Sequence, residues 1–413
     1  MMASALSRPS ERLPAYSLFA AVLSGAGLPI YIFAPKFYAD SYGVSLASLA
    51  FVLFGLRLFD VVQDPFLGWI SERLGAGRKR AIAFGGVVLA LSMLGLFAVV
   101  PPFAPIIWFA LMITGLFTAF SFLTINFYAQ GISKAGEIAG GHTRLAAWRE
   151  TGALLGVCVA AMAPVLLESM TAHPYAAFAI GFAGLALAAT ALMAPEWSGR
   201  LVSEPTAIRE ILSDKIARNL LFLALVNAAP SAVSSTLFLF FVESRLDAPG
   251  WEGGLLVLFF LSAAVSAPLW AALAGRYGAK RVLLLAMVVA IVTFGFVLAL
   301  GSGDVLWFAV VCVVSGATIG ADLTLLPALF ARRMAAISPH GGQGFGLWSL
   351  VSKFTLAFAA VILLPVLEAS GFDSGASANP PEALALLTIL YALVPCALKL
   401  VAIAILLATP LEE

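Results

Sequence analysis

The chain has 413 residues, of which 62% are hydrophobic and only 11% charged, and its mean hydropathy is +1.03. A water-soluble chain carries about a quarter of its residues charged, so this composition excludes a soluble enzyme, a nucleic-acid binder and a disordered scaffold. The net charge of +1 gives no general attraction to phosphate. Cys158, Cys312 and Cys396 lie too far apart, inside apolar runs, to suggest a disulfide framework or a zinc site. We expect an all-α membrane protein with no catalytic residues, no metal site, no cofactor and no nucleic-acid partner.

Twelve runs along the chain are long and apolar enough to cross a bilayer, which takes about 20 mostly apolar residues. Charges, glycines and prolines separate them, and the sequence lacks the alternating segments of about ten residues that barrel strands would need. The polar residues 1–13 do not have the layout of a signal peptide. The expected spans are 14–38, 44–74, 81–100, 104–130, 144–168, 174–194, 217–243, 250–275, 280–300, 304–331, 343–370 and 383–408.

The longest connection, 195–216, divides these spans into six and six. It is rich in charge, so we expect it to form a solvated helix at the membrane surface. The expected organisation is a six-helix bundle over 1–194, a cytoplasmic linker over 195–216 and a second six-helix bundle over 217–413.

Basic residues concentrate in alternate loops, which predicts the orientation by the positive-inside rule. The opposite loops contain only Lys36 and Arg245. We therefore expect a multi-pass protein of the cell (inner, cytoplasmic) membrane with both termini in the cytoplasm. The basic loops contain Arg8, Arg12, Arg73, Arg78, Lys79, Arg80, Lys134, Arg144, Arg200, Arg209, Lys215, Arg218, Arg276, Lys280, Arg281, Arg332 and Arg333.

The two halves of the chain contain a weak internal sequence repeat. DPFLGWISERLGAGRKR (64–80) follows the second span and APLWAALAGRYGAKR (267–281) follows the eighth, each with a proline, then an arginine, a glycine and a basic cluster. Six-plus-six spans with such loops resemble the major facilitator superfamily, whose halves rock about a central site. Aligning the two prolines places alanines opposite Asp60 and Asp64. The scaffold therefore recurs in both halves, whereas the acidic pair does not.

Charges inside the second and eleventh spans need a reason, since a charge in the bilayer costs at least ~2.5–3.5 kcal/mol. Asp60 and Asp64 are four residues apart and share one helix face, and adjacent carboxylates repel unless a cation or a proton neutralises one. Arg57 can pair with Asp60 in the same helix, and Lys353 is a second candidate counter-ion. Two interpretations stay open: a structural salt-bridge network between the halves, or a cation or proton site whose occupancy sets how they pack.

Four segments carry a more specific resemblance. FGLRLFDVVQDPFLGWISERLGAGRKR (54–80) is similar to the second-span signature of the glycoside–pentoside–hexuronide cation symporters, the melibiose-permease-like family. YADSYGVSLASL (38–49), LAAWRETGALLG (145–156) and GFGLWSLVSKFTLAFAAVIL (344–363) are similar to the same family. The resemblance reaches both halves, and it implies a major facilitator fold of twelve helices and cation-coupled symport.

The same resemblance implies which residues bind the cation. The family's cation site falls on Asp60, Asp64, Gln63 and Ser121, and its coupling lysine falls on Lys353. The family has asparagine at the Gln63 position, and the longer side chain shifts the ligand. Both H⁺ and Na⁺ therefore stay open as the coupling ion.

The solute site matches the family less well. The family's two sugar-binding acids fall on Ser24 and Thr124, so both carboxylates are missing, while its aromatic wall falls on Tyr128 and its fifth-span arginine on Arg149. Charge-assisted hydrogen bonds are roughly twice as strong as neutral ones. We therefore expect galactosides to bind poorly and an anionic or amphiphilic solute to bind better.

For several other residues the sequence leaves two possible roles open. Arg149 and Glu150 either close the cytoplasmic gate or bind solute; Asp322 contacts the solute or gate, or is a structural acid; Trp348 either lines the cavity or packs. Lys399 is expected to reach the cytoplasmic interface from near the end of the twelfth span. Gate or structural charges are expected at Arg57, Glu150, Arg73 and Arg78.

The sequence thus predicts a secondary active transporter that couples a small organic solute to H⁺ or Na⁺ by alternating access. Its partners would be the solute and the lipid bilayer, and we expect a monomer. Two alternatives stay open. One is a transporter of lysophospholipid or another amphiphile with the same fold, as in eukaryotic relatives of this family. The other is a membrane sensor or enzyme, against which the lack of a catalytic constellation and of an output domain stands.

Overall fold

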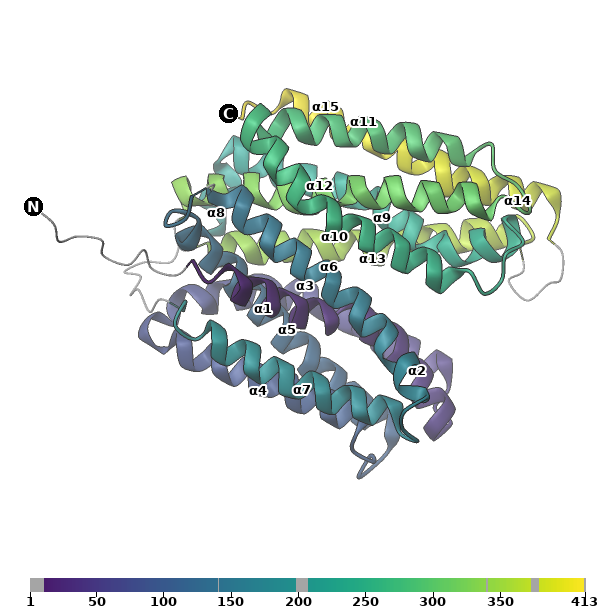
Figure 1. The fold of residues 1–413 in the computed structure, drawn as a ribbon. Coiled ribbons are helices and arrows are strands. Elements are labelled where there is room, and N and C mark those ends of the chain that lie inside the picture. Colours follow the sequence, from purple (N-terminus) through teal and green to yellow (C-terminus); the bar gives the residue numbers. More distant parts are fainter. Residues whose placement is uncertain (1–10, 140, 198–206, 339–340, 373–378, 412–413) are drawn as a thin grey trace, which may run out of the picture.

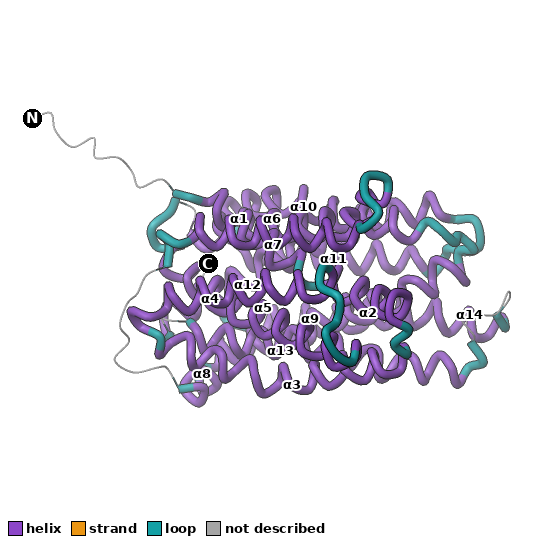
Figure 2. Tube along the Cα trace, turned by 90° about the horizontal axis from the view of Figure 1, so that it is seen from below, coloured by secondary structure: helices purple, strands orange, loops and turns teal. Residues whose placement is uncertain are grey.

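The computed structural model describes residues 11–139, 141–197, 207–338, 341–372 and 379–411, and within these ranges it contains helices and loops without a strand. The helices run side by side along the molecule, and short loops join them at its two ends (Figures 1 and 2). Helices suit the bilayer because they satisfy their backbone hydrogen bonds internally. Nine helical segments of the described chain are long and apolar enough to cross a membrane. The expected all-α membrane protein is confirmed.

Two groups of helices make up the molecule (Figure 1). The N-terminal group consists of α1 (Leu13–Gly25), α2 (Leu28–Tyr42), α3 (Leu46–Arg73), the short η1 (Gly75–Gly77), α4 (Arg78–Phe97), α5 (Pro105–Ala135), α6 (Gly141–Glu168) and α7 (Pro174–Met193). The C-terminal group consists of α9 (Lys215–Phe240), η2 (Phe241–Arg245), α10 (Glu252–Tyr277), α11 (Ala279–Val297), α12 (Val305–Ile337), α13 (Gly342–Ala369), α14 (Pro381–Thr388), η3 (Ile389–Leu393) and α15 (Val394–Ala408).

The first expected span, a single helix over 14–38, is wrong in one respect, because the structure divides it into α1 and α2. Gly25 and Gly27 flank the division, and Pro29 in the first turn of α2 has no N–H to donate to a preceding carbonyl. Glycine and proline together therefore end one helix and begin the next inside the expected span. Ser24, one of the expected solute residues, lies in the last turn of α1.

Glycines allow close packing within each group. A Cβ added at Gly152 or Gly156 of α6 would lie 2.1 or 2.2 Å from a backbone carbonyl oxygen of α1. A Cβ added at Gly316 or Gly320 of α12 would lie 2.2 or 2.7 Å from a backbone carbonyl oxygen of α10. Small residues four apart let membrane helices approach backbone to backbone. These contacts hold each group together independently of the other.

Most of the basic loops gather at one end of the molecule, here named the basic end. There Arg144 pairs with Glu11 at 2.7 Å, and Lys280 donates to the carbonyl of Thr409 at 2.8 Å. The expected solvated helix over 195–216 is shorter than predicted: α8 covers only Ile208–Ser213, and 198–206 lie outside the described residues. Figure 1 places α8 and the end of α15 on the same side as the start of α1.

The two groups of helices meet at the basic end. One apolar cluster there combines Leu67 of α3 and Ile132 of α5 with Leu329 of α12 and Leu406 of α15. The largest cluster of each group takes its buried residues from that group alone, and a small cluster of Leu154 on α6 with Ala263 and Ala264 on α10 joins the groups a second time. The described chain therefore has a core within each group and shared clusters both at the basic end and between α6 and α10.

The helices α3 and α13, one from each group, approach each other backbone to backbone. A Cβ added at Gly68 would lie 2.6 Å from the carbonyl oxygen of Gly342, and one added at Gly346 would lie 2.9 Å from that of Asp64. No other residue type fits there without moving a backbone. The approach places the side chains of α13 directly against the acidic face of α3.

Substitution of Gly68 by alanine should destabilise the protein, because the added methyl group meets a backbone carbonyl. Overpacking of this kind costs about 1–3 kcal/mol. Gly55→Ala is the matched control, since Gly55 lies on the same helix with open space around it, and alanine favours a helix by up to ~1 kcal/mol. The melting temperature in detergent should fall for Gly68→Ala and stay level or rise for Gly55→Ala. Equal melting temperatures for the two variants would contradict the close approach of α3 and α13.

Asp214 begins α9 and joins it to α12. Its Oδ1 accepts from the backbone N–H of Ala217 at 2.8 Å and from Nε of Arg333 at 2.9 Å, and its Oδ2 accepts from Nη2 of Arg333. The hydrogen bond from Arg333 lowers the pKa of the Asp214 carboxyl below its ordinary value. A lowered pKa means that the stabilisation is complete above the unfolded value of about 3.9 and is lost as the pH falls through the folded value.

Asp214→Ala should therefore cost about 1 kcal/mol or more, because it removes both the helix cap and the ion pair. Asp214→Asn keeps a capping side chain and should cost less. Between neutral pH and pH 4, thermal unfolding should distinguish wild type from both variants, and the difference should shrink at still lower pH. A wild-type melting temperature for Asp214→Ala at neutral pH would show that the cap and the ion pair contribute nothing.

Candidate functional site

The acidic pair on α3 is the starting point of the site. Asp60 and Asp64 are 1% and 0% exposed, and their spacing of four residues places them one helical turn apart on the same face. Two carboxylates at this depth need a cation, since the bilayer interior solvates neither. The structure supplies one from the other group of helices.

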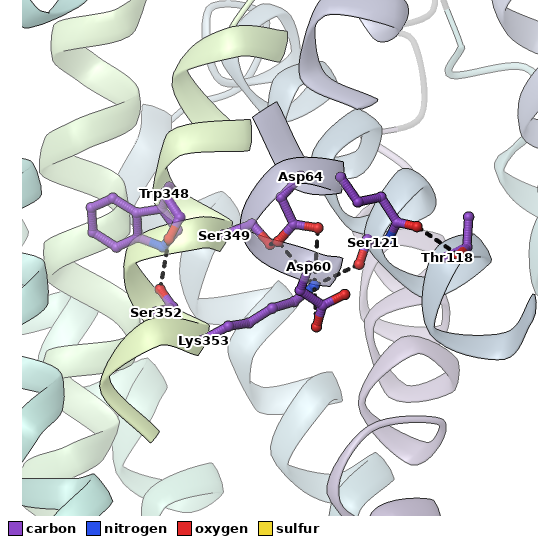
Figure 3. Close-up of polar contacts among 9 residues, drawn as sticks. Asp60, Asp64, Thr118, Ser121, Trp348, Ser349, Ser352 and Lys353 are labelled. Carbon is purple, nitrogen blue, oxygen red and sulfur yellow. Dashed lines mark hydrogen bonds and ion pairs between the residues drawn. The ribbon is translucent and has the colours of Figure 1, made fainter. Parts of the chain in front are cut away.

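Lys353 of α13 reaches across to both carboxylates (Figure 3). Its Nζ lies 2.9 Å from Oδ2 and 3.0 Å from Oδ1 of Asp64, and 3.3 Å from Oδ2 of Asp60. The expectation that Lys353 serves as a counter-ion to the acidic pair agrees with this geometry. The ion pair connects the two groups of helices, because the carboxylates lie on α3 and the ammonium on α13.

Two hydroxyls complete the group. Lys353 donates to Oγ of Ser121 on α5 at 2.6 Å, and Ser349 of α13 donates to Oδ2 of Asp64 at 2.7 Å (Figure 3). Ser121 was expected at the cation site, whereas Ser349 was not predicted from the sequence. The available signal was its spacing of four residues before Lys353, which places both on one face of α13.

Gln63 bonds to Thr118 and not to the side chains around Lys353. Its Oε1 accepts from Oγ1 of Thr118 at 2.8 Å (Figure 3), and its Nε2 is buried without a hydrogen-bond partner among the described residues. An amide nitrogen donates hydrogen bonds and does not ligate a cation. In this arrangement Gln63 presents a donor where the resemblance implied an oxygen ligand.

The net charge of Asp60, Asp64 and Lys353 determines which ligand could bind among them. Two carboxylates and one ammonium sum to a net charge of −1 over the described side chains when all three are ionised. A buried charge without compensation is far more costly than a paired one. One proton or one monovalent cation added to Asp60, Asp64 and Lys353 would bring these three side chains to zero net charge.

A second polar group lies on α5 and α6. Arg149 donates to Oε1 of Glu150 at 2.8 Å, Tyr128 donates to the same oxygen at 3.1 Å, and the guanidinium carbon of Arg149 lies 3.7 Å from the ring centroid of Tyr128. Nη2 of Arg149 is buried without a partner in the described part of the chain. Tyr128 also meets Phe345 of α13 at 5.2 Å between ring centroids. Tyr128, Arg149 and Glu150 therefore bond to one another within the N-terminal helices, and Tyr128 also contacts a C-terminal helix.

Charged residues at the end of α3 and the start of α4 bind neighbouring helices at the basic end. Oε1 of Glu72 accepts from the backbone N–H of Gln343 at 2.8 Å, in the first turn of α13, where the helix dipole favours negative charge. Arg78 donates to the side chain and the backbone carbonyl of Asn126 at 3.0 Å each. Arg73, in contrast, lies over the ring of Trp69 at 4.0 Å. Of the two arginines assigned to the gate, Arg78 binds α5 and Arg73 stays on α3.

The expectation for Lys399 is wrong. The side chain is buried rather than extended to the interface, and its ammonium pairs with Oδ2 of Asp322 and donates to Oδ1 of Asn227 at 2.7 Å. The physical reason is that Asp322 and Lys399 lie on α12 and α15, so each charge finds its counter-ion across a helix contact. Sequence spacing within one helix cannot reveal such a pair.

Two further expected solute residues, Thr124 and Trp348, form no bond to Lys353 among the described side chains. Oγ1 of Thr124 is buried and has no partner in the described structure, and Trp348 packs on Phe330 with 4.9 Å between ring centroids. The side chain of Arg57, which was expected to pair with Asp60, lies outside the described residues. No described group of His, Cys, Asp and Glu could hold a metal ion.

This fold, with buried charges joining two groups of membrane helices, defines a multi-pass membrane transporter of the major facilitator type rather than an enzyme. The family of MFS/sugar transport proteins matches residues 15–413. The chain therefore belongs to that family within the major facilitator superfamily. No curated protein matches the chain.

Solved structures agree with the fold. A bacterial homologue of the iron transporter ferroportin, in an outward-facing state, has a TM-score of 0.71 and 17% identity, over 96% of this chain and 98% of its own. A second structure of such a homologue, outward-facing with soaked iron, has a TM-score of 0.69 and 16% identity over the same shares. At these identities the similarity shows the fold alone.

Proposed function

We propose that the chain is a cation-coupled symporter of the melibiose-permease-like kind, which moves a small organic solute by alternating access. The observation that carries the proposal is the bond of Lys353 on α13 to both carboxylates of α3. A charge pair between the two groups of helices changes with their relative position, which is what coupling requires.

The coupling follows from the charges. With the carboxylates ionised, Lys353 bonds to both of them across the two groups of helices, and the negative charge of the pair attracts one proton or one Na⁺. Binding of that cation removes part of the attraction on the ammonium and so weakens the bond between α3 and α13. Since a ligand shifts an equilibrium by its differential affinity for two states, the cation then favours the arrangement in which this contact opens.

The solute is proposed to be anionic or amphiphilic. Nε2 of Gln63 and Nη2 of Arg149 are buried donors without partners among the described residues, and Ser24 and Thr124 replace the two acids that bind sugars in the related family. Donors without acceptors suit a solute with oxygen atoms or negative charge. Lysophospholipid transport is the alternative within the same fold.

The proposal includes the protein's orientation in the membrane, its moving parts and its oligomeric state. The basic end faces the cytoplasm by the positive-inside rule, in the cytoplasmic membrane. The N-terminal and C-terminal groups are the two moving halves, joined by the linker over 195–216. The protein works as a monomer in contact with its solute and the lipid.

A thermal-shift screen of the purified protein tests this proposal. Sugars, organic acids and lysolipids are each measured with Na⁺, with K⁺ and at two pH values. We expect stabilisation by an anionic or lipid-like compound that depends on Na⁺ or on pH, and weak stabilisation by melibiose. Ligand binding that does not depend on Na⁺, K⁺ or pH would contradict the proposed coupling. Micromolar affinity for galactosides would contradict the proposed solute class.

A further inference from the structure

A second buried charge cluster lies in the C-terminal group, apart from Lys353 and its carboxylates. Lys399 on α15 pairs with Asp322 on α12 and donates to Asn227 on α9. The three side chains are 5%, 7% and 5% exposed in that order. All three helices belong to one group, so these bonds do not depend on how the two groups are placed. The cluster is therefore suited to a permanent site rather than to a state-dependent contact.

The cluster lies at the depth of the acidic pair. At 1.5 Å per residue, its positions along α9, α12 and α15 place it roughly 14–22 Å from the basic end, and Asp60, Asp64 and Lys353 roughly 14–20 Å from it. Solute sites of transporters lie near the middle of the membrane, between the repeats. The depth of Asp322 matches that position.

Asp322 also lies on a face of α12 whose apolar residues join clusters shared by the two groups of helices. Ile319, three residues earlier and thus on the same face, packs into a cluster that contains Leu154 of α6. Leu326, four residues later, belongs to the cluster with Leu67 and Ile132. Asp322 therefore lies in sequence between two residues that belong to clusters shared with the N-terminal group.

One oxygen of this carboxylate has no partner. Oδ2 of Asp322 accepts from Lys399, whereas Oδ1 is buried without a hydrogen bond to any described residue. An unsatisfied buried acceptor is destabilising, and more so when it is charged. Lys399 already balances the negative charge, so a second cation would leave the buried cluster positive. An uncharged donor satisfies Oδ1 without that penalty.

We propose that Oδ1 of Asp322 is a solute-binding acceptor which takes an uncharged hydroxyl or amide N–H, with Lys399 and Asn227 as the residues that position it. This inference rests on the proposed function and adds a solute class to it. The N-terminal group offers unpartnered donors at Gln63 and Arg149, and the C-terminal group offers an acceptor. The solute then carries an acceptor or anionic group at one end and hydroxyl or amide donors at the other.

Three linear six-carbon compounds test this inference as probes. Gluconate has a carboxylate and hydroxyls, hexanoate has only the carboxylate, and sorbitol has only hydroxyls. Binding to the purified protein is measured by thermal shift and calorimetry at equal low-millimolar concentrations. We expect gluconate to bind at least tenfold more tightly than hexanoate, since a hydrogen bond to a charged group contributes at least the roughly 1.4 kcal/mol that a tenfold change in affinity represents.

The decisive variant exchanges the charges, Asp322→Lys with Lys399→Asp. It keeps an ion pair but removes the free oxygen from α12, so gluconate should bind it no better than hexanoate. General stabilisation by polyols would affect wild type and variant alike. If the exchange does not fold, the neutral pair Asp322→Leu with Lys399→Met, which also removes the acceptor from α12, takes its place with the same expectation.

The outcomes separate this inference from the proposed function. Equal binding of gluconate and hexanoate to wild type, an unchanged preference in the variant, or no binding of any probe would overturn the role of Asp322. Cation-dependent binding of another solute would still support the symporter in each of those cases. Binding of sorbitol as tight as that of gluconate would support the acceptor at Asp322 and overturn the anionic solute.

Discussion

Proteoliposomes that contain the Asp64→Asn variant are expected to exchange solute across the membrane but not to accumulate it. Asparagine keeps the shape of the side chain and an acceptor for Ser349, but it removes one negative charge from the group around Lys353. Without that charge the site is neutral and has no reason to bind a coupling cation. Exchange needs only the solute and the movement of the two groups, so it should persist.

The measurement uses the solute identified by the thermal-shift screen and compares uphill uptake with counterflow. Glu382→Gln, which removes an exposed acid at the start of α14, is the matched control and should accumulate solute like wild type. Uphill accumulation at the wild-type level by Asp64→Asn would remove Asp64 from the coupling role. Loss of counterflow as well would show a general defect of folding or solute binding.

Lys353→Ala is expected to lower the stability of the protein strongly, and a second substitution in the acidic pair should restore part of it. Removal of one partner from a buried ion pair costs about 3–5 kcal/mol, because the other charge stays buried without compensation. Lys353 is bonded to Asp64 and lies 3.3 Å from Asp60. Lys353→Ala with Asp64→Asn leaves fewer unpaired charges than Lys353→Ala alone.

The double-mutant cycle measures this coupling by melting temperature and by the yield of folded protein. Residues in one hydrogen-bonded network show coupling energies of 0.5–3 kcal/mol. Lys79→Ala, which removes an exposed lysine at the basic end, serves as the control and should be additive with Asp64→Asn. Additive effects of Lys353→Ala and Asp64→Asn would show that the two charges do not interact in the folded protein.

The fold was predictable from the sequence because membrane spans are read from the length of apolar runs, and the chain has such runs throughout. The two halves were visible in the weak repeat around the second and eighth spans. The division of the first span into α1 and α2 was not predicted. A hydropathy count averages over the glycines and the proline that end one helix and start another.

The candidate site was predictable where the signal lies within one helix or in a family motif. Asp60 and Asp64 follow from their spacing, and Lys353 from its position inside a span. The pairing of Asp322 with Lys399 was missed because it depends on how α12 packs against α15, which one sequence does not contain. Ser349 was missed because serine is common in membrane helices and gains its meaning only from Asp64 beside it.

The most direct test of the central claim is a count of the cations that the acidic group binds. Potentiometric titration of the purified protein, with and without Na⁺, gives the number of exchangeable protons or Na⁺ ions per chain for wild type and for Asp64→Asn. Two carboxylates and one ammonium predict that wild type binds one monovalent cation more than the variant. Identical titration curves for the two proteins, in Na⁺ and in its absence, would contradict a coupling site at Asp60, Asp64 and Lys353.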